Sequence, residues 1–463
     1  MKTTKHTALV GAAVAATLLV GWLGASMYVG HSVQDKLSAL VQASSQSKTY
    51  RLSKLQHESG LFSSSGQVEI TLIDGCDEKA KPSDQPSAQI SYKLSNLIMP
   101  TSLLRGDWTL APTDKAKPDF EKVFGGQPTL TGRGRVLLSG AFESDMNLPA
   151  LNVVSSGETL TVSPSTGTIA VGKDTLDLDW KTTKITHRGS GSALEIEGFS
   201  VTSSLTSIKR GLGTLSLGMD KFGTSIASAD GLRLSFKAVE GNGRYDMFIT
   251  PSMKSLNAGG KQFSDLLLEM AVKGMDAQSI AFLIDLSDRS CNFRNLTLDE
   301  SKQMQANLRQ LLFKGMSAGI QKLTGKVDGG SLDGQLMVEF GETKGSTFEL
   351  EKILRSHGEL KLTGSGVKPD DKKTLVSMGI AQEVPDGVRA SFDYASGVLK
   401  VNGKVFDATL METVLKSANA GINQFLTGSG RRVVETKLPE AMDVEPPEAD
   451  GDAPAKQPNS DDT

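Results

Sequence analysis

The chain has 463 residues, of which 38% are hydrophobic and 22% are charged, with a formal net charge of −3 and two cysteines. This composition excludes a fully disordered chain, a collagen and a disulfide-dense small protein. The charge balance provides no clustered basic surface for phosphates, so we also exclude nucleic acid as a partner. The length allows roughly two to three domains, or one longer β architecture.

The first predicted element is an apolar segment over residues 8–30, which contains no charged residue. A helix of this length covers roughly 35 Å, which is enough to cross a hydrocarbon core of about 30 Å. Lys2 and Lys5 precede the segment, and basic flanks stay in the cytoplasm. We therefore predict a cytoplasmic stub (residues 1–7), one transmembrane helix (8–30) and export of the remaining chain.

A cleaved signal peptide is the alternative, because Gly24 and Ser26 form a small-x-small site after a shorter apolar core. Under both interpretations the body lies outside the cytoplasm, where Cys76 and Cys291 can meet an oxidant. The sequence does not show whether the Cβ atoms of these cysteines come within reach of each other. A disulfide between them and two separate thiols both stay open.

A membrane-proximal helix is predicted next, over residues 31–48. Val33, Leu37, Leu40 and Val41 have the spacing of one face of an amphipathic helix. This helix is expected to stand just above the membrane.

From residue 49 to residue 430 the apolar residues recur with a period of two, which is typical of half-buried strands. The clearest runs are 68–72, 90–94, 176–180 and 232–236. Turn signals lie between such runs, at 73–75, 156–157, 241–243, 328–330 and 396–397. We therefore predict a mainly β (α+β) body of extended antiparallel sheets, with a few amphipathic helices, on the periplasmic side.

The longest helical pattern in this body covers residues 299–323, with Asp299 as the expected N-cap. Shorter helical patterns cover residues 117–124, 276–284, 372–380 and 407–426. A Gly- and charge-rich stretch near 190–212 indicates a boundary between two lobes. Residues 431–463 are predicted to be an acidic disordered tail, because 439–463 holds eight acidic residues, one Lys and five Pro.

Residues suited to catalysis or metal binding are sparse. The histidines are His6, His31, His57, His187 and His357. They show no metal-ligand spacing, and neither cysteine has a Cys or His companion nearby. No phosphate-binding loop is present either. We predict no catalytic residue, no metal and no cofactor.

One short motif suggests a hydrolase. Residues 315–319 match G-x-S-x-G around Ser317, with Asp328, Asp333 and His357 following in hydrolase order. A nucleophile elbow needs a strand before the serine and a helix after it, whereas Ser317 falls inside the predicted helix 299–323. Close helix packing explains the small residues better.

Two motifs resemble a known family. Residues 58–68 contain the run Gly-Leu-Phe-Ser-Ser, and residues 390–404 contain Y-x-x-G-x-x-x-x-N-G. After an N-terminal anchor, they resemble the opening segment and the closing hairpin of the YdgA-like family of bacterial proteins, a domain of unknown function. The alternation over 266–272 followed by Gly-Met-Asp-Ala (274–277) is similar to the family's step from strand into helix, with Met275 where Leu is expected.

The motif residues are structural in character: Gly60, Leu61, Phe62, Ser63, Ser64, Tyr394, Gly397, Asn402 and Gly403. The glycines are expected to supply positive φ and the aromatic residues to supply packing. The resemblance implies an inner-membrane protein that faces the periplasm of a Gram-negative envelope. It implies no activity.

We therefore predict a single-pass inner-membrane protein with a non-enzymatic binding or scaffolding role, whose partners are the bilayer and a lipid or another envelope protein. Lipid binding or transport in an apolar groove is one alternative, and it predicts apolar residues on both faces of several strands. A scaffold predicts a sheet edge that another strand can pair with. An envelope hydrolase is the other alternative, using either Ser317 and His357 or, for a glycosidic bond, an unrecognised pair of carboxylates.

Overall fold

The computed structural model describes residues 33–427 apart from short gaps, of which 74–84, 96–101 and 125–129 are the longest. The predicted stub (1–7), span (8–30) and acidic tail (431–463) lie outside the described residues. Within the described part of the chain, no helix is long and apolar enough to cross a membrane.

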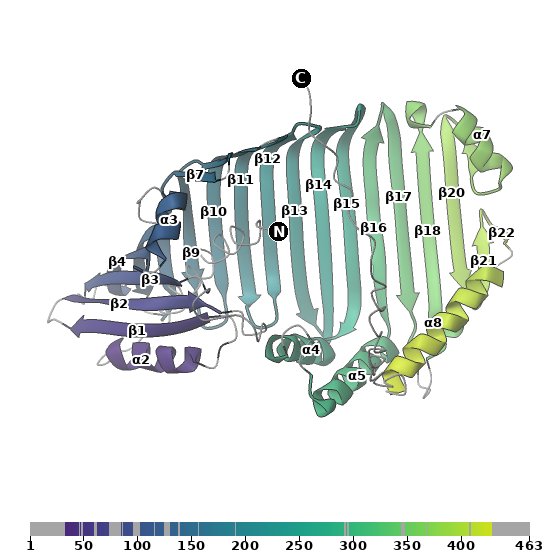
Figure 1. Ribbon diagram of the computed structural model, residues 1–463. Coiled ribbons are helices and arrows are strands. Elements are labelled where there is room, and N and C mark those ends of the chain that lie inside the picture. Colours follow the sequence, from purple (N-terminus) through teal and green to yellow (C-terminus); the bar gives the residue numbers. More distant parts are fainter. Residues whose placement is uncertain are drawn as a thin grey trace, which may run out of the picture.

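The described residues form one 22-stranded sheet, in which neighbouring strands pair antiparallel (Figure 1). The first strands are β1 (Tyr50–Ser59), β2 (Ser63–Leu72), β3 (Ser87–Ser95), β4 (Ser102–Pro112), β5 (Leu130–Leu137), β6 (Phe142–Leu148), β7 (Leu151–Ser155), β8 (Glu158–Val162), β9 (Ser165–Val171), β10 (Leu176–Gly189) and β11 (Ser192–Ser207). The others are β12 (Leu212–Thr224), β13 (Ala227–Gly241), β14 (Arg244–Ala258), β15 (Lys261–Asp276), β16 (Met316–Val327), β17 (Gly330–Phe340), β18 (Leu354–Thr363), β19 (Gln382–Val384), β20 (Gly387–Ala395), β21 (Val398–Val401) and β22 (Lys404–Val405). The predicted mainly β, antiparallel fold class is confirmed.

Most helices lie near the ends of the strands, whereas the first helix, Val33–Ser44, lies alongside β1 (Figure 1). The helices are α2 (Val33–Ser44), α3 (Lys117–Phe124), α4 (Ala277–Arg289), α5 (Leu298–Phe313), α6 (Leu350–Ile353), α7 (Pro369–Ser377) and α8 (Thr409–Thr427), with a 3₁₀ turn η2 (Gly364–Gly366). Each of the predicted segments 117–124, 276–284, 372–380 and 407–426 overlaps one of these helices. The predicted helix 31–48 is confirmed over residues 33–44.

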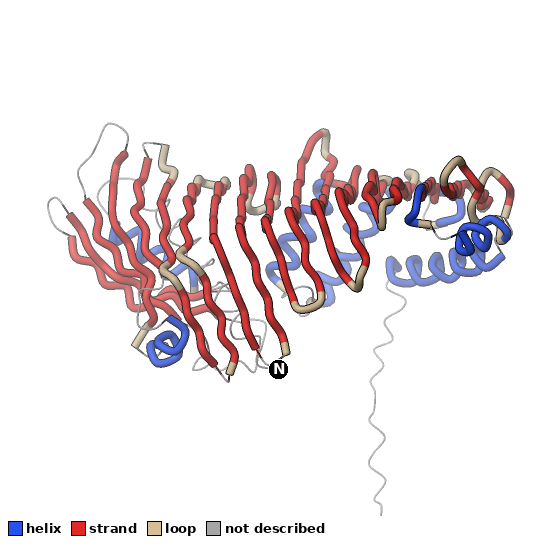
Figure 2. Tube along the Cα trace, turned by 90° about the horizontal axis from the view of Figure 1, so that it is seen from above, coloured by secondary structure: helices blue, strands red, loops and turns tan. Residues whose placement is uncertain are grey.

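Consecutive strands are neighbours over most of the sheet, as the predicted meander requires. The order runs β1 to β6, then β9, β10 and on to β18, β20, β21 and β22. β1 to β3 lie across the direction of the central strands, whereas β11 to β20 form one extended layer (Figures 1 and 2). Residues 192–212, in the stretch predicted as a boundary, form β11 and the turn into β12, which pair continuously with their neighbours. The division into two lobes stays a prediction.

The tight turns explain this regular meander. Asn242, Asp328, Ser396 and Asn402 have positive φ, and each is followed by a glycine that also has positive φ. Two consecutive residues of this kind match the twist of a two-residue hairpin. The turn signals that the sequence shows at these positions are confirmed.

Three separate clusters of buried side chains stabilise the sheet. The first lies at the curled end, where Leu37 and Leu40 of α2 pack with residues of β1 to β6, β9 and β10. The second joins the ends of β13 to β15 to α4 and α5. The third joins the ends of β17, β18, β20 and β21 to α8. The side chains on the sheet between these clusters belong to none of the three clusters.

The predicted helix 299–323 is wrong in its second half. α5 ends at Phe313, Gly315 has a φ of 76°, and β16 begins at Met316. The helix also begins earlier than expected, because Thr297 rather than Asp299 is the N-cap and forms a capping box with Glu300. The helical spacing of the apolar residues continued past Gly315, and the pairing of β16 with β15 and β17 overrides it.

Asp276 connects the sheet to the helices at its lower end. The predicted step from strand into helix is confirmed, since β15 ends at Asp276 and α4 begins at Ala277. The carboxylate is only 3% exposed. It accepts hydrogen bonds from the backbone N–H and the hydroxyl of Ser279 at 3.0 and 2.7 Å, from Gln310 Nε2 at 3.1 Å and from Lys314 Nζ. Asp276 therefore fixes both α4 and α5 to the sheet.

The charge state of Asp276 follows from the same contacts. Burial raises the pKa of this carboxyl, but the hydrogen bonds from Lys314 and Ser279 outweigh it and hold the pKa below its ordinary value of 3.8. A depressed pKa means that the ionised carboxylate stabilises the fold above the ordinary pKa. This stabilisation is lost as the pH falls through the lower pKa of the folded state.

Replacing Asp276 by Ala is expected to lower the free energy of unfolding by about 2–3 kcal/mol, because an N-cap and charge-assisted hydrogen bonds are lost together. Urea unfolding followed by circular dichroism measures this change. Asp299→Ala is the matched control, since Asp299 is exposed in the first turn of α5 and makes no cap. Its loss should stay below about 1 kcal/mol. Equal losses in the two variants would contradict the role of Asp276.

Candidate functional site

Residues that lie directly opposite one another across β10 to β20 form apolar rows on one face of the layer. The first row is Trp180, Val201, Leu217, Leu234, Pro251, Leu268, Leu323, Gly334, Leu360 and Ala390. The second row, on the same face, is Leu178, Ser203, Leu215, Phe236, Ile249, Met270, Ile320, Leu336, Gly358 and Phe392. The apolar set is interrupted only at Ser203 and by two glycines. One of these, Gly358, lies against the ring of Phe392.

A third row continues this face on the other side of the first row. It contains Met219, Leu232, Met253, Leu266, Leu332 and Leu362. We call the residues of the three rows between β11 and β20 the apolar strip. The opposite face is mainly polar, because the alternate positions carry a row made of Asp179, Thr202, Ser216, Ser235 and Thr250. Phe248, Leu267 and Met337 are apolar exceptions on that face.

The apolar strip is not covered by another layer of the described residues. Its aliphatic and aromatic side chains on β11 to β18 all remain partly exposed, and Leu360 is 39% exposed. None of these strip residues belongs to one of the three buried clusters. In a globular sheet an apolar face is normally buried against helices or a second sheet. The strip therefore presents apolar surface that is available to a ligand.

The two long margins of the strip differ in character. At the lower margin, Ala238, Met247 and Val272 pack under α4 and α5, so the helices end the exposed surface there. At the upper margin a register shift between Ser264 and Leu267 changes which residues of the strands face this side, so the next row here is again apolar: Phe263, Leu256, Ala229, Phe222 and Ile196. At the same height, the opposite face of the layer carries a row of polar residues, which we call the polar row: Lys184, Glu197, Lys221, Asp230, Ser255 and Ser264.

The polar row is held together by its own interactions. Glu197 forms ion pairs with Lys221 at 3.2 Å and with Lys184 at 3.5 Å, and Ser255 donates a hydrogen bond to Asp230 at 2.6 Å. The hydrogen bond from Lys221 and its positive charge hold the pKa of Glu197 below its ordinary value. The row therefore carries both signs of charge at neutral pH.

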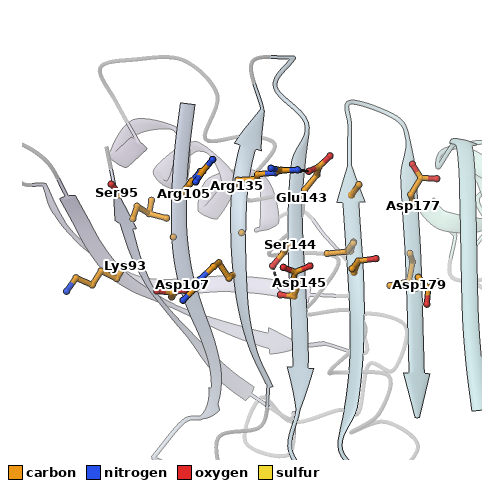
Figure 3. Close-up of a pocket in the computed structure, with 18 of the residues that line it drawn as sticks. Lys93, Ser95, Arg105, Asp107, Arg135, Glu143, Ser144, Asp145, Asp177 and Asp179 are labelled. Atoms are coloured by element: carbon orange, nitrogen blue, oxygen red, sulfur yellow. Dashed lines mark hydrogen bonds and ion pairs between the residues drawn. The ribbon is translucent and has the colours of Figure 1, made fainter. Parts of the chain in front are cut away.

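A concave pocket of about 970 Å³ lies over β3 to β6, β9 and β10 (Figure 3). Its basic residues come from β3 to β5 (Lys93, Arg105, Arg133 and Arg135), and most of its acidic residues come from β6 and β10 (Glu143, Asp145, Asp177 and Asp179). Arg133 pairs with Asp107 at 2.9 Å and Arg135 with Glu143 at 2.7 Å. Exposed ion pairs of this kind contribute little to the stability of the fold, because their charged groups remain in contact with water.

No described group of three or more His, Cys, Asp or Glu side chains can hold a metal ion. Cys76 and Cys291 both lie outside the described residues, so their predicted disulfide stays open. Of the opening motif, Gly60, Leu61 and Phe62 also lie outside them. Ser63 and Ser64 begin β2, where Ser64 is buried.

The residues of the predicted hydrolase motif are not brought together. Ser317 lies on β16, after a helix rather than before one, which is the reverse of a nucleophile elbow. His357 lies on β18 and contacts Asp393 at 2.6 Å, while β17 separates it from β16. Two strand spacings amount to about 10 Å, which exceeds hydrogen-bond distance. The absence of an enzymatic activity stays a prediction.

The closing motif is structural, as the sequence indicates. Tyr394 is buried against α8 and β21, and Gly397 and Gly403 have φ values of 81° and 78°. The Asn402 carboxamide accepts from the backbone N–H of Ser391 at 2.9 Å and donates to the carbonyls of Gly379 and Ile380, both at 3.0 Å. This one side chain ties the β21–β22 turn to β20 and to the end of α7.

The apolar strip was not found from the sequence, although the signal is present there. The alternation that predicts half-buried strands recurs from β10 to β20, so that one face receives most of the apolar residues. Which strands are neighbours, and that no second layer covers them, depends on pairing between residues and on helix positions that the period does not encode.

Comparison with known proteins gives a family and no activity. A family model described as "Bacterial protein of unknown function (DUF945)" matches residues 4–366, well over half of the chain. The match ends before the hairpin over residues 390–404. No curated protein and no solved structure matches the chain.

Asn402→Gly is expected to loosen the C-terminal edge, because it keeps the positive φ but removes the three hydrogen bonds of the carboxamide. The expected cost is about 1–2 kcal/mol. Hydrogen exchange of the peptides covering residues 379–406 should show faster exchange at Ser391. Ser396→Gly, at the other positive-φ turn position, is the control and should leave exchange unchanged. Equal exchange in the two variants would overturn this role of Asn402.

Proposed function

This chain belongs to the bacterial family of unknown function DUF945, and we propose that it binds the acyl chains of a lipid along the apolar strip. The single observation that carries the proposal is the three-row apolar surface on a layer whose other face is polar. Apolar surface gains about 25 cal/mol per Å² when it leaves water. An acyl chain supplies this burial without any specific hydrogen bond.

A lipid explains the strip better than a partner strand does. The scaffold prediction requires a sheet edge that can pair, but the edges of this sheet are poorly suited to it. β1 carries a bulge with Lys54 at positive φ, and the opposite edge is made of the short strands β19, β21 and β22. Bulges, charges and short edge strands discourage pairing with another chain.

The structure differs in one respect from what the sequence analysis requires of a lipid-binding groove. That prediction requires apolar residues on both faces of several strands, whereas one face of this layer is apolar and the other is polar. A ligand that covers one face of a single layer needs only that face to be apolar. The ligand then takes the position that a second sheet or a helix layer has in a closed domain.

We further propose that the protein is a YdgA-like, single-pass protein of the bacterial inner membrane, anchored by residues 8–30, with the sheet in the periplasm. The support is the apolar length of residues 8–30 and the lysines that precede them. In this location the apolar strip has access to membrane lipid.

The proposal is tested by saturable binding of pyrene-labelled palmitate to the purified full chain in a mild detergent. Ile249→Lys is expected to weaken binding at least about tenfold, because an ammonium group would lie unpaired against the acyl chain. Thr250→Lys is the matched control, since the neighbouring side chain lies on the polar face. It should leave the affinity unchanged.

Thermal unfolding of both variants verifies that they fold. No saturable binding by the unmodified chain, or equal weakening by the two folded variants, would contradict the proposal.

A further inference from the structure

The pocket over β3 to β6, β9 and β10 lies on the face of the sheet opposite the apolar strip. Asp179, which lines the pocket, belongs to the same cross-strand row as Thr202 and Ser216 of the polar face. The pocket volume of about 970 Å³ falls at the upper end of the range for ligand pockets, about 300–1,000 Å³. A ligand in this pocket would therefore be separate from a lipid on the apolar strip.

The basic wall of the pocket contains a guanidinium group that no described carboxylate neutralises. Arg105 lies directly opposite Arg135 on the neighbouring strand, and like charges in this arrangement repel each other. Arg135 pairs with Glu143 at 2.7 Å, whereas Arg105 Nε donates to Ser102 Oγ at 3.0 Å. Ser95 lies directly opposite Arg105 on the other side and adds a hydroxyl group (Figure 3). This wall is therefore suited to an anion.

A carboxylate fits this wall because a guanidinium group can donate two parallel hydrogen bonds to it. The side chains of Arg135 and Glu143 are 47% and 34% exposed, so their ion pair adds little stability. Arg135 can then share its donors with a ligand at small cost. A bound carboxylate between Arg105 and Arg135 would also remove the repulsion between the two guanidinium groups.

The acidic wall carries negative charge at the other end of the same cross-strand row. The row crosses the pocket through residues that lie directly opposite one another: Arg105, Arg135, Glu143, Ala170 and Asp177 (Figure 3). Asp177 forms no ion pair with the described part of the chain, and Asp179 forms only an exposed pair with Lys181 at 3.2 Å. These two carboxylates can accept hydrogen bonds from an ammonium group, which has three donors.

The separation of the two charged walls matches a short extended peptide. Four strand-to-strand steps of about 4.8 Å lie between Arg105 and Asp177, or about 19 Å in total. The strand next to the acidic wall, β9, carries only small side chains toward the pocket, Thr168 and Ala170, which leave room for a chain across the strands. An extended chain covers about 3.3–3.6 Å for each residue, so about five residues span this distance.

We propose that this pocket binds a short peptide across the strands, with its C-terminal carboxylate at Arg105 and its N-terminal ammonium group at Asp177. A peptide carries charges of opposite sign at its two ends, as the two walls require. A simple anion would neutralise only the basic wall, and a polyamine only the acidic wall. This binding site goes beyond the proposed function and does not depend on it.

Calorimetric titration of the purified full chain in a mild detergent with the pentapeptide Gly-Ser-Gly-Ser-Gly tests the proposal. Saturable binding is expected. Amidation of the C-terminus or acetylation of the N-terminus should each weaken binding at least about tenfold, because one charged contact is lost. Arg105→Gln should weaken binding of the free peptide by a similar factor and have no further effect on the amidated peptide. Asp177→Asn should behave in the same way toward the acetylated peptide.

Two substitutions of exposed charges on the same face, outside the pocket, are the matched controls: Lys237→Gln and Asp333→Asn. Both should leave the affinity unchanged. No saturable binding by the unmodified chain, equal affinity for the free and blocked peptides, or equal weakening by the controls would overturn the proposal. Binding that depends on Asp177 but not on Arg105 would indicate a site for cations alone and would also overturn it.

The experiment separates this proposal from lipid binding. Thermal unfolding verifies that each variant folds, and Arg105→Gln and Asp177→Asn should both keep the affinity of the unmodified chain for pyrene-labelled palmitate. Loss of peptide binding with palmitate binding intact overturns or supports only the proposal for the pocket, according to the variant in which it occurs. Failure of the unmodified chain to bind palmitate would contradict only the proposed function.

Discussion

The structure depends on one constraint: a sheet that is apolar on one face must keep that face from water. In the described residues, this sheet meets the constraint only at its curled end and along one margin, where α2, α4, α5 and α8 pack on it. Between them the apolar strip remains partly exposed. The hydrophobic effect is proportional to the area removed from water, so covering this surface would contribute binding energy.

The helices set the shape of this surface. Asp276 caps α4 and binds Lys314 and Gln310 at the end of α5, so both helices are held over the ends of β13 to β15. Because these helices stop at the strand ends, the next three rows stay open. On the other side, Phe222, Ala229 and Leu256 continue the apolar surface.

The sequence predicts the strands and turns well, because alternation and positive-φ residues such as Asn402 and Gly403 are local signals. It fails at Ser317, where the helical spacing of the apolar residues continues through Gly315 and pairing with β15 and β17 decides the structure. The strip could not be predicted, because rows such as Leu217 opposite Leu234 depend on register between strands. The contacts of Asp276 with Lys314 likewise join residues far apart in the chain.

The central claim is that lipid covers the apolar strip of the intact protein in its membrane. The most direct measurement places a benzophenone-bearing residue at Leu234 or at Ser235, irradiates cells, and identifies the adducts by mass spectrometry. These neighbouring positions face opposite sides of the same strand. The account predicts phospholipid adducts at position 234 and none at 235. Adducts to protein alone at 234, or the same lipid adducts at both positions, would contradict it.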